Sequence, residues 1–179
     1  MGVEGKVIVL LASLALAALH GLSSSSVPRP VQNVRLKTLL ESFSYFEGDW
    51  ECAGKFDSSG KTIEAHEHFE ADLDGTWLFS RRDDKPPFKY HAQSQWGWDS
   101  GHKGFVMLVQ DSGGGAREFH SDGWDSGRLQ WDGDALGTAS APSQRFTYER
   151  LDDRHFKVSY FTRKTGDWSR MDSSTCGKG

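Results

Sequence analysis

The sequence predicts an all-β protein, an antiparallel up-and-down barrel of about ten strands preceded by one short N-terminal helix. Aromatic residues make up 12% of the chain, and 20 Gly stand against 5 Pro, a composition that suits strands joined by tight turns. From residue 49 onward, short and often alternating runs are separated by clusters of Asp, Ser and Gly, which is the pattern of successive hairpins. At 179 residues the chain has room for one domain.

The N-terminus has the order of a secretory signal peptide followed by a linker. Lys6 precedes an apolar run at 7–19, and a Ser-rich stretch with Pro28 and Pro30 follows. We expect residues 1–22 to be the signal peptide, 23–33 a flexible linker and 34–178 a single barrel domain. The apolar run is shorter than the roughly 20 residues that span a bilayer. We therefore expect a periplasmic or secreted protein without stable membrane insertion, with an uncleaved anchor as the alternative.

A short amphipathic helix is expected over residues 34–46. Apolar side chains recur there at helical spacing, at Leu36, Leu39, Leu40 and Phe43. Gly48 then supplies a stop signal. The chain changes from helix to strand at this point.

Ten strands are expected after the helix. Their ranges are 49–56, 61–73, 76–83, 89–99, 104–111, 117–124, 128–134, 143–151, 155–163 and 167–176. Asp, Ser and Gly dominate the connections, and these residues close tight hairpins. No connection in this stretch is long enough for a βαβ crossover, so the strands are expected to be antiparallel.

The only two cysteines lie in the first and last predicted strands, Cys52 and Cys176. An even pair in an exported chain indicates a disulfide. A closed barrel would make these two strands neighbours and leave no exposed edge. The alternative is a cytosolic protein with two reduced thiols.

Three short motifs carry a family resemblance. Gly48-Asp49-Trp50 after a short helix resembles the calycin superfamily of lipocalins, fatty-acid-binding proteins and nitrobindins. With Asp74-Gly75-Thr76-Trp77 and Trp96-Gly97-Trp98-Asp99, the stretch 43–177 is similar to a family of small exported bacterial proteins of unknown function. The resemblance implies a calycin-like barrel. In lipocalins an Arg near the chain end packs over the first-strand Trp, but pairing Cys52 with Cys176 would place Arg170 near the other end.

Alternation predicts which side chains point into the barrel. Trp50, Cys52 and Phe56 share one face of the first strand, and Glu67 is inward on the second. A three-residue hairpin loop would then place Arg81 opposite Glu67, which would compensate a buried carboxylate. The residues that we expect to contact a ligand are Glu67, Trp77, Phe79, Arg81, Gln95, Trp96, His120, Arg145 and Tyr160.

Other functions have less support in the sequence. The net charge is −4 with scattered Lys and Arg, so no nucleic-acid partner is expected. His66 and His68 are expected to face solvent, and no metal site is predicted. The resemblance to nitrobindins raises haem binding through a late-strand His, for which His155 and His120 are the candidates, but no cofactor is predicted. No catalytic motif is present.

The sequence therefore favours an exported, non-enzymatic barrel that binds an unknown small molecule. One alternative is a packed barrel that acts as a structural or interaction module. The other is a barrel enzyme or a haem-binding, nitrobindin-like protein.

Overall fold

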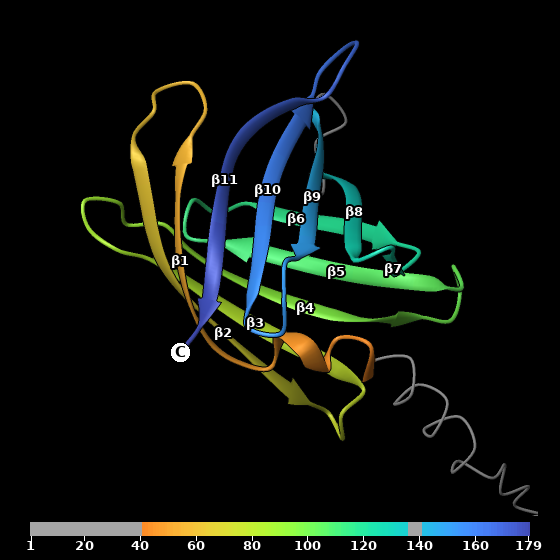
Figure 1. Cartoon of the computed structure of the whole chain (residues 1–179). Coiled ribbons are helices and arrows are strands. Elements are labelled where there is room, and N and C mark those ends of the chain that lie inside the picture. The colour runs from red at the N-terminus through yellow and green to blue at the C-terminus, as the bar shows by residue number, and fades with distance from the viewer. Residues whose placement is uncertain (1–40, 136–140) are drawn as a thin grey trace, which may run out of the picture.

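The strands form one antiparallel sheet that closes on itself (Figure 1). The structure is a computed structural model, and it describes residues 41–135 and 141–179. The sheet order is β6-β5-β4-β3-β2-β1-β11-β10-β9-β8-β7, and a further pairing of β6 with β8 completes the ring. The strands are β1 Gly48–Phe56, β2 Thr62–Asp72, β3 Trp77–Asp84, β4 His91–Asp99, β5 Gly104–Asp111, β6 Ala116–Ser121, β7 Trp124–Asp125, β8 Arg128–Ala135, β9 Ser143–Arg150, β10 His155–Arg163 and β11 Ser169–Lys178.

The predicted all-β class and the ten-stranded closed barrel are confirmed in the described part of the chain. Only the two-residue strand β7 stands outside the ring, because it pairs with the start of β8 alone. The sequence predicted one strand over 117–124 where the structure has β6 and β7. Gly123 separates them with φ of +99°, a conformation that does not continue a strand.

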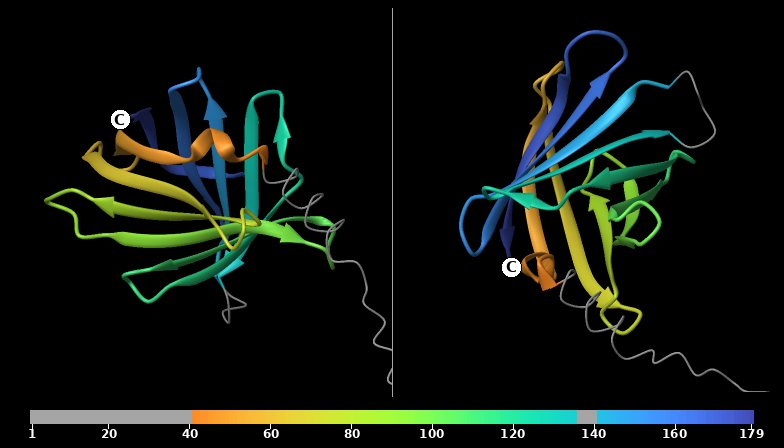
Figure 2. Two further views of the ribbon diagram at one scale, coloured as in Figure 1. Left: turned by 90° about the horizontal axis from the view of Figure 1, so that it is seen from below. Right: turned by 90° about the vertical axis from the view of Figure 1, so that its right-hand side faces the viewer.

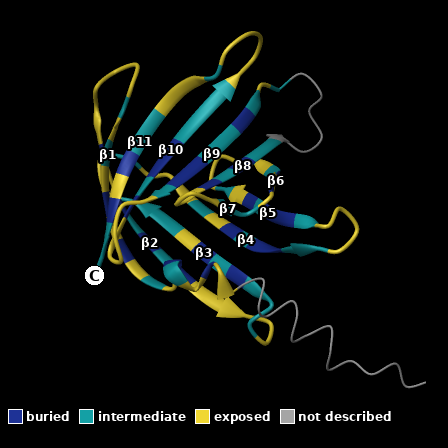
Figure 3. Cartoon of the chain, turned by 45° about the vertical axis from the view of Figure 1, so that its right-hand side comes forward, coloured by how far each residue is buried: buried dark blue, intermediate teal, exposed yellow. Residues whose placement is uncertain are grey.

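One half of the barrel interior is packed with aromatic side chains. A single 3₁₀ turn, η1 (Ser44–Phe46), lies across the end of the barrel from which β1 starts (Figure 2, left). Phe43, directly before this turn, and Phe46, its last residue, are fully buried, and the Phe46 ring lies 5.1 Å from Trp96 and 5.3 Å from Phe156. The segment before β1 therefore plugs this end. Buried and exposed residues alternate along the strands around it (Figure 3).

The predictions for the N-terminus fall mainly outside the described residues. The signal peptide, the linker and the first part of the helix expected over 34–46 lie within residues 1–40. In the described part of the chain, no helix is long and apolar enough to cross a membrane.

The predicted disulfide between Cys52 and Cys176 is present and joins β1 to β11. The two residues are direct partners in the register, which also pairs Trp50 with Lys178. The Lys178 ammonium lies 5.2 Å from the centre of the Trp50 ring, so a lysine, and not Arg170, supplies the cation at this tryptophan. Arg170 lies at the other end of the β1–β11 strand pair, where its Nε donates to Asp57 at 2.8 Å.

Candidate functional site: a cavity in the open half of the barrel

A cavity of about 360 Å³ occupies the half of the barrel away from η1. Its aromatic wall consists of Phe56, Phe88, Tyr90, Phe146, Tyr148 and Tyr160. Its acidic and basic side chains are Glu67, Arg82, Asp84, Lys89, Arg117 and Asp172. Because β1 and β10 end and β11 begins at this side, Phe56, Tyr160 and Asp172 meet there. The cavity thus combines apolar rings with an unusual number of charges.

The buried carboxylate predicted at Glu67 is present, and its partner is Arg82. The Glu67 residue is 5% exposed, and burial raises the pKa of its carboxyl, an effect that the positive charge of Arg82 opposes. Arg82 Nη1 lies 3.8 Å from the Glu67 carboxylate, while its Nε donates to Asp84 at 3.0 Å. The positive charge of Arg82 is therefore shared between two carboxylates.

The expectation that Arg81 would face Glu67 was wrong, and the β2–β3 turn explains why. The register pairs Asp72 with Trp77 and Glu67 with Arg82, which leaves four residues in the turn, 73–76, where three were expected. Leu73, Asp74 and Gly75 have positive φ there. A one-residue change in a hairpin turns every side chain of the next strand to the other face.

Because side chains alternate between the two faces of a strand, the same register places three β3 residues outside the cavity, although they were predicted to contact a ligand. Trp77 and Phe79 lie on the outer face, half-buried, and Arg81 is exposed and pairs with Asp83 at 2.9 Å. The inward face of β3 instead carries Leu78, Ser80, Arg82 and Asp84.

Of the remaining predicted contacts, Tyr160 lines the cavity and the others do not. Trp96 points inward but is fully buried in the packed half. Gln95 pairs with Phe79 on the outer face. His120 was expected inside but is exposed and lies 3.0 Å from Glu118. Arg145 donates to Asp132 and stacks over Trp168 at 4.2 Å, also outside.

Arg117 is the second guanidinium of the cavity, and Asp111 neutralises it. Its Nη2 donates to Asp111 and, at 3.4 Å, to the Tyr90 hydroxyl. Asp111 also accepts from the backbone of Gly113 and Gly115 at 2.9 and 3.0 Å, so the turn after β5 holds the carboxylate in place. Arg117 Nε is buried without a hydrogen-bond partner among the described residues.

Asp172 differs from the other carboxyls of the cavity because it has neither a hydrogen bond nor an ion pair within the described ranges. Burial raises the pKa of its carboxyl to about 6; Arg82 opposes this shift, and Asp84 and Asp57 add to it. At neutral pH the residue is therefore an ionised and poorly compensated group.

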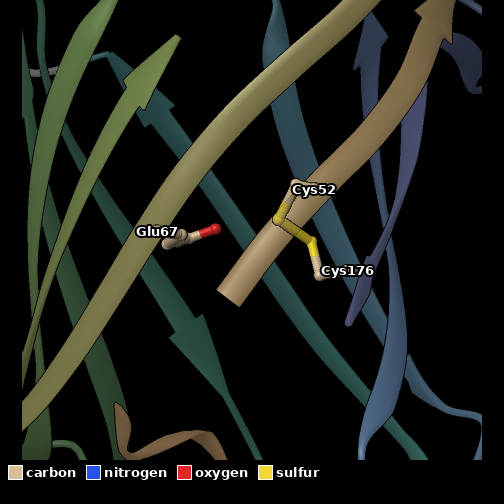
Figure 4. A group of neighbouring side chains, drawn as sticks. All are labelled: Cys52, Glu67 and Cys176. Carbon is tan, nitrogen blue, oxygen red and sulfur yellow. A yellow bond between two sulfur atoms is a disulfide. The ribbon is translucent and has the colours of Figure 1, made fainter. Parts of the chain in front are cut away.

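Among the described residues, one cluster resembles a metal site, but its chemistry does not support metal binding. Cys52, Glu67 and Cys176 hold possible ligand atoms within 4.8 Å of one another, and the Glu67 carboxylate points toward the two sulfurs (Figure 4). Both sulfurs are joined in the disulfide, and metals bind the thiolate form of cysteine.

The two histidines considered for haem lie outside the cavity. His155 is exposed and its Nδ1 lies 2.9 Å from Asp152 at the start of β10, and His120 is on the outer face. His66 and His68 lie on the outer face of β2, as expected, beside Asp49 and Glu51. The described cavity lining contains no histidine.

Sequence reasoning missed Arg82, Asp84, Arg117 and Asp172. Arg82 and Asp84 point inward only because the β2–β3 turn has four residues. The sequence Asp72-Leu73-Asp74-Gly75-Thr76 was compatible with a turn of that length. Asp172 lies in a Ser-rich strand that is polar on both faces. No alternation signal was available there.

Comparisons with known proteins show a distant likeness of fold. Neither a protein-family model nor a curated protein matches the sequence. A de novo designed fluorescence-activating β-barrel aligns with 13% identity and a TM-score of 0.41, covering 75% of this chain and 94% of that one. A redesigned barrel, mFAP1, bound to DFHBI aligns with 12% identity and a TM-score of 0.35, covering 75% of this chain and 95% of that one.

Proposed function

We propose that this chain is an exported, non-enzymatic barrel that binds a small, partly apolar molecule in the cavity. The observation that carries the proposal is the cavity itself, about 360 Å³ in volume and lined by aromatic rings and a few ionisable groups. Small-molecule sites have volumes of roughly 300–1,000 Å³ and mostly apolar walls with a few polar groups. Within the cavity, Glu67, Arg82, Asp172 and Tyr160 are the proposed polar contacts.

Export is supported by the disulfide and by the N-terminal sequence. A buried disulfide between the first and last strands is typical of proteins that fold in an oxidising compartment. The order of residues 1–22 favours a signal peptide. Both agree with a periplasmic or secreted location.

The alternative of a packed structural module fits only half of the barrel. Aromatic side chains fill the interior next to η1, whereas the half toward Phe56 and Asp172 is hollow. A module that needed only stability would gain free energy by filling this space with apolar side chains.

Native mass spectrometry of the protein purified from its host tests the proposal. We expect a co-purified small molecule in the wild type. The variant Ala92→Phe, which fills the cavity wall, should lose it, and Ala53→Phe, on the exposed outer face of β1, should retain it. A ligand-free wild-type protein, or equal occupancy of both variants, would contradict the proposal.

A further inference from the structure

The open half holds more carboxyl groups than guanidinium groups. Four carboxyls belong to this half in the described residues, Glu67, Asp84, Asp111 and Asp172, and two guanidiniums, Arg82 and Arg117. Four minus two leaves an excess of two carboxyls. Lys89 is exposed and lies at the cavity mouth, where water screens its charge.

Each guanidinium already has a carboxylate partner, which disfavours an anionic ligand, although Arg117 Nε has no hydrogen-bond partner among the described residues. Arg82 is bonded to Asp84 and lies near Glu67. Arg117 is bonded to Asp111 and Tyr90. A carboxylate or phosphate ligand would have to displace these partners and leave their charges buried, which is costly.

Asp172 stands in a row of aromatic side chains across neighbouring strands. The register places Phe56 of β1 on one side of it and Tyr160 of β10 on the other. Phe146 of β9 continues the row, with its ring 4.9 Å from that of Tyr160. All four line the cavity. A carboxylate between aromatic rings suits an ammonium group, which can bond the carboxylate and lie against the faces of the rings.

We propose that the cavity selects an organic cation, an ammonium group on an apolar body, whose nitrogen binds Asp172 between Phe56 and Tyr160. This inference rests on the proposed function and adds the chemical class of the ligand. The apolar body would lie along Phe146 and Tyr148. The cation supplies the positively charged partner that Asp172 lacks in the ligand-free protein.

Three probes of the same shape and different charge test the proposal: phenylbutylamine, phenylbutanol and phenylbutanoate, measured by calorimetry on the full oxidised protein. We expect the amine to bind at least about tenfold more tightly than the alcohol, and the anion to bind most weakly. Equal or tighter binding of the alcohol or the anion would overturn the cation proposal while leaving a small-molecule site. If none binds, the cation proposal fails, and native mass spectrometry still decides the proposed function.

The pH dependence gives a second readout. Three charged groups act on Asp172: Arg82, Asp84 and Asp57, the last of which is paired with Arg170. Tyr160 lies opposite Asp172 on β10, and Glu67 and Arg117 line the same cavity. The cation binds the ionised carboxylate, and the pKa of Asp172 is about 6. The affinity for the amine should therefore fall about tenfold from pH 7 to pH 5, because about nine in ten carboxyls become protonated.

Two matched variants assign the effect to Asp172. Asp172→Asn should weaken binding of the amine at pH 7 at least about tenfold and flatten its pH dependence, while the alcohol changes less than about twofold. Asp167→Asn, at an exposed position before β11, should behave as the wild type. Unchanged amine affinity in Asp172→Asn would overturn the assignment.

Discussion

At the residue scale, the ionised carboxylate of Asp172 lowers the stability of the ligand-free protein. Its pKa is raised from 3.8 to about 6 by burial, so the folded state holds this proton more tightly than the unfolded chain does. Protonation of Asp172 therefore favours folding; this contribution is fully present below about pH 4 and is lost as the pH rises from about 4 through 6. A group that destabilises the empty protein at neutral pH is typical of a functional site.

The variant Asp172→Asn should consequently stabilise the ligand-free protein at pH 7.5. We expect the free energy of unfolding to rise by about 1–2 kcal/mol, after allowance for partial exposure, and the gain to vanish near pH 4, where the wild-type carboxyl is neutral. Urea unfolding at the two pH values measures it. A loss of stability at pH 7.5 would show that Asp172 has a structural role.

Gly54 is a residue-scale requirement for barrel closure. A Cβ at this position would meet the backbone of Ser173 and Ser174 on β11, which cannot move without disturbing the β1–β11 pairing. Gly54→Ala should lower the free energy of unfolding by about 1–3 kcal/mol. Gly104→Ala, whose Cβ would lie 3.5 Å from its nearest neighbour, should change it by less than about 1 kcal/mol. Equal effects in chemical denaturation would contradict this reading.

At the scale of the element, η1 and its flanking residues act as the plug of the packed half. Phe46 is fully buried, and its ring lies within 5.6 Å of Phe69, Trp96 and Trp124. The short turn therefore owes its order to tertiary packing, since three residues cannot form a stable helix alone.

Phe46→Ala should lower the free energy of unfolding by about 3–5 kcal/mol, because it leaves a cavity among aromatic rings. Thermal or urea unfolding measures the loss. Leu151→Ala, at a site that is 54% exposed, is the matched control and should remain within about 0.5 kcal/mol of the wild type. A small effect of Phe46→Ala would show that the plug does not contribute to the core.

At the scale of the whole molecule, the disulfide joins residues 124 positions apart. Closing so long a loop restricts the unfolded chain, and the chain-entropy model gives roughly 4–5 kcal/mol as an upper estimate. The barrel itself stays paired through β1 and β11 on either side of the bridge.

The variant Cys52→Ala/Cys176→Ala should therefore keep the circular dichroism spectrum of the wild type but unfold at lower urea concentration, with a loss of up to about 4–5 kcal/mol. The reduced wild-type protein should behave in the same way. Coincident unfolding curves for the oxidised and reduced proteins would contradict the stabilising role of the bridge.

The sequence by itself determined the fold class, the ten barrel strands and the disulfide. These follow from local signals: alternation within a strand, Asp and Gly in the hairpins, and two cysteines in the terminal strands. If Cys52 and Cys176 are taken as directly opposite, the register of the closing pair follows, and the structure has this register.

Only the tertiary structure decided which charged residues meet inside the barrel. Glu67 was predicted from its own strand, but its partner depended on whether the turn at 73–76 holds three or four residues, and that difference selects Arg82 over Arg81. Asp172 and Tyr160 come together through pairing of β10 with β11. Alternation sets a face only within one strand, whereas the site is assembled from registers across several, so a one-residue difference in a single turn changes its composition.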